Sequence, residues 1–280
     1  MALRFLAAAA CSLLITEGAA VAQRPAAARI DDRVRDYIAR FEQEAAALVA
    51  EERYVQRVDL RGQTAPGAAR TRELRSDYVL VKPADTEPWL GYRDIYEVDG
   101  TPVRERDARI VHILGTTAPD SLARAAAFAR EGSRYNLGPE RTINTPTLPM
   151  QLLARANARR FRLRAPRGWE RQERVYLTFS EGTRPTLVRT PEGLSVESRG
   201  TITVRVRDGA ILAADLRFHF SGTRRDDPEA VLRVEYGDVP GVTVPVPLRM
   251  TEELPMPDGR ASGIATYTNY RRFQTSARIR

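Results

Sequence analysis

The chain has 280 residues, of which 44 are Lys or Arg and 36 are Asp or Glu, with a formal net charge of +8 and one cysteine. A chain of this length buries enough surface to fold without disulfides. Lys82 is the only lysine, and the arginines are spread along the sequence rather than clustered. This distribution predicts a solvated basic surface and argues against nucleic-acid binding, while contact with an anionic membrane surface stays open.

The N-terminus has the features of a secretory signal peptide over Met1 to Ala22. Arg4 provides a positive start, the following apolar run is too short to span a bilayer, and Ala20-Val21-Ala22 forms a small-x-small cleavage site. Cleavage removes Cys11, which excludes disulfides and cysteine-based metal or redox sites from the mature chain. We therefore expect a protein of the periplasm or the extracellular space without a transmembrane span.

The first element after a flexible leader, residues 23–29, is predicted to be an amphipathic helix. Asp31 or Asp32 can cap it. Its apolar residues recur at three-to-four spacing, which predicts one stripe packed on a flat partner: Ile30, Val34, Tyr37, Ile38, Phe41, Ala45 and Leu48. An extended segment from Arg53 to Leu60 follows, and then a loop with a turn at Pro66-Gly67.

Two strands, Leu74 to Lys82 and Trp89 to Val98, come next, with a turn at Asp99-Gly100. Three helices are predicted in the middle of the chain, over residues 107–114, 119–131 and 147–158. Thr147 is the expected N-cap of the last one, with Pro149 in its first turn.

From Phe161 onward, apolar and polar residues alternate, as is typical of half-buried antiparallel strands. In the clearest stretch, Thr201 to Ser221, two alternating runs flank Asp208-Gly209. This arrangement predicts a β-hairpin in which Gly209 takes a positive φ in a tight primed turn.

A later strand over residues 242–248 contains Pro245 and Pro247, which cannot donate to a ladder. It is therefore expected at a sheet edge or at a bulge. The last strand is predicted from Ile264 to Phe273.

The segregation of helices from strands indicates an α+β fold. We predict a single domain over residues 30–280. It consists of a large curved antiparallel β-sheet, a half-barrel, packed on the N-terminal helix and the mid-chain helices.

Catalytic patterns are weak in this sequence. His112 and His219 lack any metal-ligand or triad spacing, so no metal site or cofactor is predicted. Asp94 and Glu97 are a carboxylate pair, but in a regular strand Arg93 and Glu97 share one face and Asp94 takes the other. Ion pairing with neighbouring arginines is the simpler interpretation, and no catalytic residue is assigned.

The segment from Ser133 to Pro146 is polar and non-periodic, and it contains the hydrogen-bonding residues Arg134, Tyr135, Asn136, Arg141 and Asn144. Long ordered loops often carry function. The alternative is structural: these side chains tie down backbone groups where two helices meet the sheet.

Large apolar side chains are expected on the inward face of the sheet: Trp89, Phe161, Phe179, Leu216, Phe218 and Phe220. If helices fill the concavity these residues are core, and if helices fill it in part they line a lipid-sized pocket.

The layout of signal peptide, amphipathic helix, mid-chain helices and closing antiparallel run resembles the LolA/LolB-like periplasmic lipoprotein-carrier superfamily. That resemblance covers most of residues 30–275 and implies an open curved sheet that holds acyl chains in an apolar cavity. It assigns no binding residue. The segments YRDIYEVDG (92–100), RYNLGPERTINTPT (134–147) and ATYTNYRRF (265–273) resemble uncharacterised exported bacterial proteins.

The leading functional hypothesis is non-catalytic binding of an apolar or amphiphilic ligand, a lipid or lipoprotein, in the cell envelope. One alternative is an envelope scaffold or interaction module with a filled core. Another is a hydrolase that uses Asp94, Glu97, His112 or the Ser133–Pro146 segment.

Overall fold

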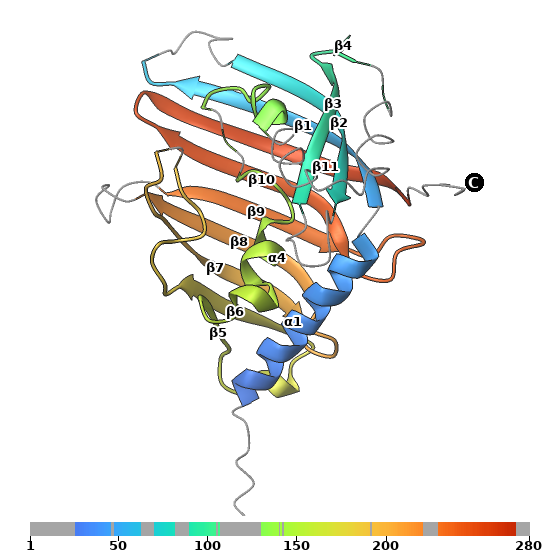
Figure 1. The fold of residues 1–280 in the computed structure, drawn as a ribbon, viewed down its shortest axis with the longest axis vertical. Coiled ribbons are helices and arrows are strands. Elements are labelled where there is room, and N and C mark those ends of the chain that lie inside the picture. The colour runs from blue at the N-terminus through green and yellow to red at the C-terminus, as the bar shows by residue number, and fades with distance from the viewer. Residues whose placement is uncertain are drawn as a thin grey trace, which may run out of the picture.

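A computed structural model describes residues 26–45, 48–62, 70–81, 90–104, 106, 130–139, 141, 143–190, 192–220 and 229–272. The fold is one curved 11-stranded antiparallel sheet with helices on one face, which confirms the predicted α+β half-barrel (Figure 1). We call the face that carries the helices the inner face and the opposite one the outer face.

The strands are β1 (Leu48–Leu60), β2 (Arg70–Val81), β3 (Leu90–Val98), β4 (Thr101–Pro102), β5 (Phe161–Arg164), β6 (Arg174–Glu181), β7 (Val196–Arg205), β8 (Ile211–Phe220), β9 (Ala230–Gly237), β10 (Val246–Met256) and β11 (Gly259–Arg272). Their order is β4-β3-β2-β1-β11-β10-β9-β8-β7-β6-β5. Two meanders, β1 to β4 and β5 to β11, are therefore joined where β1 pairs with β11. Among the described strands the sheet is open, with β4 and β5 as its edges.

The N-terminal helix α1 (Ala26–Ala45) lies across the inner face (Figure 1). All of its predicted stripe residues are buried, from Ile30 to Ala45, and Leu48 is buried as the first residue of β1. The predicted start at Asp31 or Asp32 is wrong, because residues 26–29 of the expected leader are already helical. Alanine-rich sequence favours helix, which explains why it extends past the aspartates.

The hairpin of β7 and β8 forms where the sequence predicted it, with Gly209 at a φ of +73°. The connection is longer than a two-residue primed turn. Arg205 N–H donates to the Ala210 carbonyl at 2.9 Å, and Gly209 N–H donates to the Arg205 carbonyl at 2.9 Å. The Asp208 carboxylate accepts from the Ala210 N–H at 3.1 Å and from Arg205, which stabilises the longer loop.

The proline-containing strand is an interior strand that carries a bulge, which confirms the prediction of an edge position or a bulge through its second alternative. β10 begins at Val246 and pairs with both β9 and β11. Its register with β9 shifts between Pro247 and Arg249. Pro247 itself aligns with Tyr236 of β9, whereas the ladder with β11 begins only at Arg249, so Pro247 has no position to fill in that second ladder.

The helix α4 (Leu148–Leu153) starts after Thr147 as predicted, with Pro149 in its first turn. It ends early because Ala154 takes an extended conformation, and a 3₁₀ turn (Arg155–Asn157) follows. The predicted helix over 107–114 lies outside the described residues. Of the predicted helix 119–131, the structure describes residues 130 and 131, which are helical, and the helix continues through Gly132 and Ser133.

Arginines on the outer face pair with carboxylates on neighbouring strands. Arg53 binds Glu73 at 2.6 Å, and Arg233 binds Asp215 at 2.8 Å. The charge on these strands is thus distributed through cross-strand pairs, as the solvated-surface interpretation predicts.

Candidate functional site

Strands β5 to β9 present an apolar inner face. The predicted inward residues Phe161, Phe179, Leu216 and Phe218 are all buried there, and Phe220 is half-buried at the end of β8. The rings of Phe161 and Phe179 meet edge to face, with centroids 6.0 Å apart. Trp89 lies outside the described residues. Four of the six predicted residues therefore belong to the hydrophobic core, and we call these four, Phe161, Phe179, Leu216 and Phe218, the apolar floor.

Helices α1 and α4 cover part of this floor (Figure 1). The buried Arg35 of α1 fixes their positions. Its guanidinium donates to the carbonyls of Leu153 at 3.0 Å and Phe161 at 3.1 Å, and its Nε binds Asp31 at 2.9 Å. One side chain thereby connects α1 to the end of α4 and to the edge strand β5.

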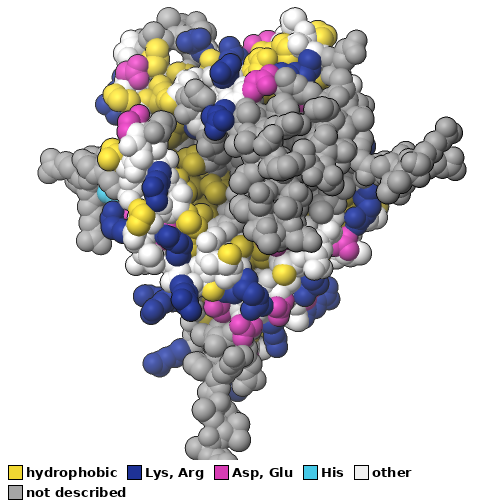
Figure 2. Space-filling view, viewed as in Figure 1, with side chains coloured by type: hydrophobic (Ala, Val, Ile, Leu, Met, Phe, Trp, Pro, Cys, Tyr) yellow, Lys and Arg dark blue, Asp and Glu magenta, His cyan; other side chains and the backbone are white. Residues whose placement is uncertain are grey.

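A hollow opens on the inner face beside these helices. Figure 2 shows hydrophobic side chains at its bottom. Ser198 of β7 lies among the apolar floor residues, directly opposite Phe218 of β8. Its side chain is 1% exposed, and its Oγ has no hydrogen-bond partner in the part of the chain that the structure describes. A buried hydroxyl without a hydrogen-bond partner costs free energy, so a polar group placed next to Ser198 would be stabilising.

The other half of the inner face, which we call the polar half, carries buried polar and charged side chains among apolar ones, and the sequence analysis did not anticipate them. Glu52, Tyr54 and Gln56 of β1 all point inward and are buried. Gly263 of β11 and Glu252 of β10 lie opposite each other in register, and the Tyr54 ring lies against Gly263. A Cβ at Gly263 would come within 2.6 Å of this ring, so the glycine allows Tyr54 to lie flat across the sheet.

Glu52 is held by three side chains from three different strands. Arg93 Nη2 donates to Oε1 at 2.8 Å, Ser76 donates at 2.6 Å and the Tyr267 hydroxyl donates at 2.8 Å. Burial raises the pKa of the Tyr267 phenol well above its usual range, and the Glu52 carboxylate raises it further. Tyr267 therefore stays protonated and keeps donating.

The predicted polar segment, residues 133–146, lies on this polar half. Arg141 Nε donates to Glu252 Oε2 at 3.0 Å, and the Tyr54 hydroxyl also donates to Glu252. Asn144 Nδ2 donates to the Tyr54 oxygen at 3.1 Å, and Gln56 binds Asn136 at 3.2 Å. Arg141, Asn144 and Asn136 are thus buried against the sheet, whereas Tyr135 is half-buried and Arg134 is exposed.

These contacts agree with the structural alternative for the segment. Asn136 Nδ2 donates to the Arg141 carbonyl at 2.9 Å, and Arg141 donates to the carbonyls of Leu137 and Pro139. Side chains tie down backbone, as that alternative required. The sequence carries one signal for the inward residues of β1, because Glu52, Tyr54 and Gln56 occupy every second position. The alternation was missed because polar residues, Glu51, Arg53 and Arg57, also occupy the opposite face.

The carboxylates proposed for a hydrolase do not converge on the inner face. The β2–β3 register shifts at Arg75 and Ser76, so that Glu97 pairs with Arg75 and Asp94 with Asp77, both on the outer face. The expectation that Arg93 and Glu97 share a face is therefore wrong, because a bulge lies between them. Arg104 binds Asp94 at 3.2 Å and Arg75 binds Glu97 at 3.4 Å.

His219 lies on β8 at a half-buried position, and His112 lies outside the described residues. Within the described part of the chain, no group of three or more His, Cys, Asp or Glu side chains is arranged to hold a metal ion. No described helix combines the length and apolar character needed to cross a membrane.

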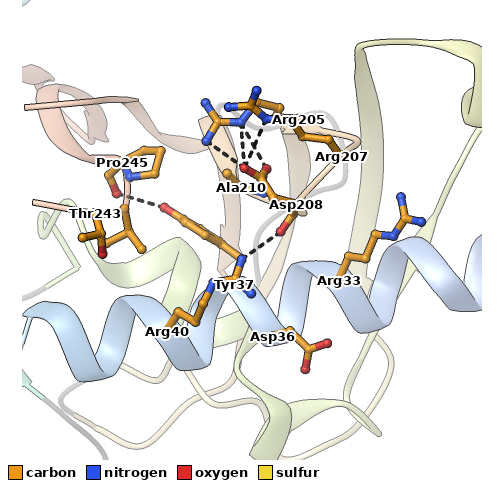
Figure 3. Close-up of a pocket in the computed structure, with 11 residues that line it drawn as sticks. Arg33, Asp36, Tyr37, Arg40, Arg205, Arg207, Asp208, Ala210, Thr243 and Pro245 are labelled. Carbon is orange, nitrogen blue, oxygen red and sulfur yellow. Dashed lines mark hydrogen bonds and ion pairs between the residues drawn. The ribbon is translucent and has the colours of Figure 1, made fainter.

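A separate pocket of about 430 Å³ lies between α1, the tip of the β7–β8 hairpin and the β9–β10 connection (Figure 3). Tyr37 of α1 forms part of its wall, and its hydroxyl donates to the Pro245 carbonyl at 2.9 Å. Four arginines line this pocket, two from α1 and two from the hairpin. The sequence gave no sign of it, because only the docking of α1 on the hairpin brings these residues together.

Comparison with known proteins gives structural matches alone. The chain is similar to a LolA superfamily protein. That crystal structure, from Nitrosomonas europaea, shares 11% sequence identity, with a TM-score of 0.33, over 90% of this chain and 95% of the other. A DUF1329 family protein from Desulfovibrio piger also shares 11% identity, with a TM-score of 0.35, over 86% and 92% of the two chains.

No protein-family model and no curated protein matches the sequence. The similarity to the LolA superfamily that the sequence layout indicated is thus found again among solved structures. At these scores it carries no argument about ligand or activity, which must come from the site itself.

Proposed function

We propose that this chain is an exported, single-domain binding protein of the cell envelope that holds an apolar or amphiphilic ligand, a lipid or a lipoprotein acyl chain. The ligand lies on the apolar floor beside α1 and α4, and no catalytic step is involved. The Met1–Ala22 pattern supports export.

The hollow with hydrophobic side chains at its bottom is the observation that carries the proposal (Figure 2). Each methylene buried there would contribute about 0.8 kcal/mol. The unpartnered hydroxyl of Ser198 supports an amphiphilic ligand, because a polar group on the ligand would give it a partner.

The direct test is to express residues 23–280, extract the purified protein for lipid mass spectrometry, and titrate it with a fluorescent fatty acid. We expect co-purifying lipid and saturable probe binding that lipid displaces. A protein that carries no lipid and does not bind the probe would contradict the proposal.

Two matched substitutions test whether the fluorescent fatty acid binds to the inner face or to any exposed hydrophobic side chain. Phe220→Glu places a charge at the half-buried end of β8, next to the apolar floor, whereas Ile264→Glu places one on the outer face, where Ile264 is 46% exposed. We expect Phe220→Glu to weaken probe binding about tenfold or more, since a charge is costly beside an acyl chain. Ile264→Glu should leave binding unchanged.

A filled-core scaffold is the second candidate, favoured by the complete burial of Phe161, Leu216 and Phe218. On that reading the inner face is occupied by the protein's own side chains. Normal stability of the Phe220→Glu variant, together with the absence of probe binding by the wild type, would support it.

A further inference from the structure

The arginine-lined pocket between α1 and the β7–β8 hairpin is lined by none of the apolar floor residues named above (Figure 3). Arg33 and Arg40 are two turns apart on the same side of α1, and Arg205 and Arg207 directly precede the hairpin tip at Asp208. Because the lining comes from three segments distant in sequence, its geometry is set by the tertiary fold.

The positive charge in this pocket exceeds the negative charge. Its two carboxylates are already engaged: Asp36 pairs with Arg155 at 2.6 Å, and Asp208 pairs with Arg205 at 3.0 Å and Arg207 at 3.5 Å. Two further charges belong to this count, because Asp238 lies 3.7 Å from Arg205 and Arg155 is the partner of Asp36. With both included, five guanidinium groups are matched by three carboxylates, which leaves two positive charges in excess.

The two arginines of α1 are bound to backbone oxygens. Arg33 donates to the Val206 carbonyl at 2.8 Å, and Arg40 donates to the Asp208 carbonyl at 3.0 Å. A carbonyl accepts a hydrogen bond but does not neutralise the cation, so both guanidinium groups are oriented and remain charged.

The contact beneath these arginines is close. A Cβ at Gly209 would come within 2.2 Å of the Arg33 carbonyl oxygen, so hairpin and helix backbones touch there. The guanidinium groups are thereby carried on two elements that are held against each other. Such preorganisation lowers the cost of binding an anion.

We propose that this pocket binds a phosphate monoester. The group carries between one and two negative charges near neutral pH, which matches the excess in the pocket, and it offers several acceptor oxygens to planar guanidinium groups. The volume of about 430 Å³ accommodates the ester's organic part beside the phosphate. The proposal goes beyond the function proposed above and does not depend on an occupied apolar floor.

The source of the ester is either a free metabolite or the headgroup of a lipid, and two probes distinguish them. One is sn-glycerol 3-phosphate, followed by phosphorus NMR and calorimetry at constant ionic strength. The other is sedimentation with phosphatidylcholine vesicles that do or do not contain phosphatidic acid. Binding of the soluble ester identifies a free ligand, and binding restricted to phosphatidic acid vesicles identifies a headgroup.

The variant that tests the pocket is Arg40→Gln/Arg207→Gln, which removes two exposed arginines of the lining. Its control, Arg162→Gln/Arg164→Gln, makes the same change of charge at exposed positions of the edge strand β5. We expect the pocket variant to bind the phosphate probe at least about tenfold more weakly, with the control unchanged.

Equal binding by both variants, or no saturable binding by any phosphate probe, would overturn the proposal. Circular dichroism and the fluorescent fatty acid titration are measured on the same samples. A pocket variant that keeps its fold and its fatty acid binding while losing the phosphate probe separates this site from the apolar floor.

Discussion

The buried residues with the most specific interactions are the charged pairs on the polar half of the inner face. Arg141 is 8% exposed and Glu252 is 6% exposed, and each has its partner within direct hydrogen-bonding distance. A buried ion pair is not itself strong evidence of stability, because desolvation offsets much of the attraction. Removing one member, however, leaves the other charge buried without its partner.

Arg141→Met should therefore lower the free energy of unfolding by about 3–5 kcal/mol. Glu252 would keep the Tyr54 hydroxyl but lose its cation. Urea denaturation monitored by tryptophan fluorescence measures the change. The double variant Arg141→Met/Glu252→Leu should recover part of the loss, and a double variant as unstable as the sum of the singles would contradict this account.

Arg53→Met is the matched control on the outer face of the same sheet. Arg53 binds Glu73 at 2.6 Å but its side chain is 58% exposed. Water screens such a pair, so we expect no measurable change in the unfolding midpoint.

Acidic pH should destabilise the protein through carboxylates held by arginines. Hydrogen bonds from Arg106 and Asn269 lower the pKa of Glu51 below its usual value of 4.5. A folded-state pKa below the unfolded one stabilises the protein above about pH 4.5, and this stability is lost as the pH falls through the folded pKa.

The expected profile of Tm is flat between about pH 7 and 5 and falls below that range. In Glu51→Gln the fall should be shallower, since one titrating group is gone. Differential scanning calorimetry at several pH values measures both profiles. Identical acid limbs in the variant and the wild type would exclude Glu51 as a contributor.

Among the elements, α1 and the β7–β8 hairpin lie so close that their contact is sensitive to a single methyl group. Gly209→Ala places a Cβ against the Arg33 carbonyl and also forces a φ of +73° on alanine. Separation of α1 from the hairpin would expose the inner face that α1 covers.

Comparison with Gly168→Ala separates the steric cost of the Gly209→Ala substitution from its backbone strain. Gly168 has the same φ of +73°, but its Cβ would meet nothing within 4 Å. We expect a cost of about 1 kcal/mol for Gly168→Ala from backbone strain, and about 2 kcal/mol more for Gly209→Ala from overpacking. Equal costs in thermal or urea unfolding would show that α1 moves away without penalty.

The elements that were predictable are those in which one periodicity dominates. The helical stripe of α1 and the alternation in β7 and β8 have a single dry side, so burial and pattern coincide. The register shift at Arg75 and Ser76 was not predictable, because a bulge leaves no mark in the alternation of a strand with large side chains on both faces.

At the scale of the whole molecule, one part of the candidate site was predictable from the sequence and the other part was not. The apolar floor follows from strand alternation, and residues such as Phe161 and Phe218 were placed on the correct face. The polar half and the arginine pocket depend on which strands neighbour each other and where α1 docks. Tyr54, Arg141 and Glu252 come from three distant segments, and a single sequence does not show that they meet.

The junction of the two meanders also bears on how the chain is made. Leu48, near the start of the described chain, pairs with Arg272 at its end, so β1 has only one of its two neighbours until β11 arrives. Of the described strands, β11 is synthesised last. The entropy cost of bringing β1 and β11 together across the intervening chain can be offset by their pairing only at that point. The export proposed above requires a chain that stays unfolded while it crosses a membrane, and a sheet whose two parts are joined only by its last described strand meets that requirement. Truncation before β11 would leave two separate sheets with exposed edge strands. Such edges pair with other chains and aggregate, so we expect the truncated protein to be degraded or insoluble.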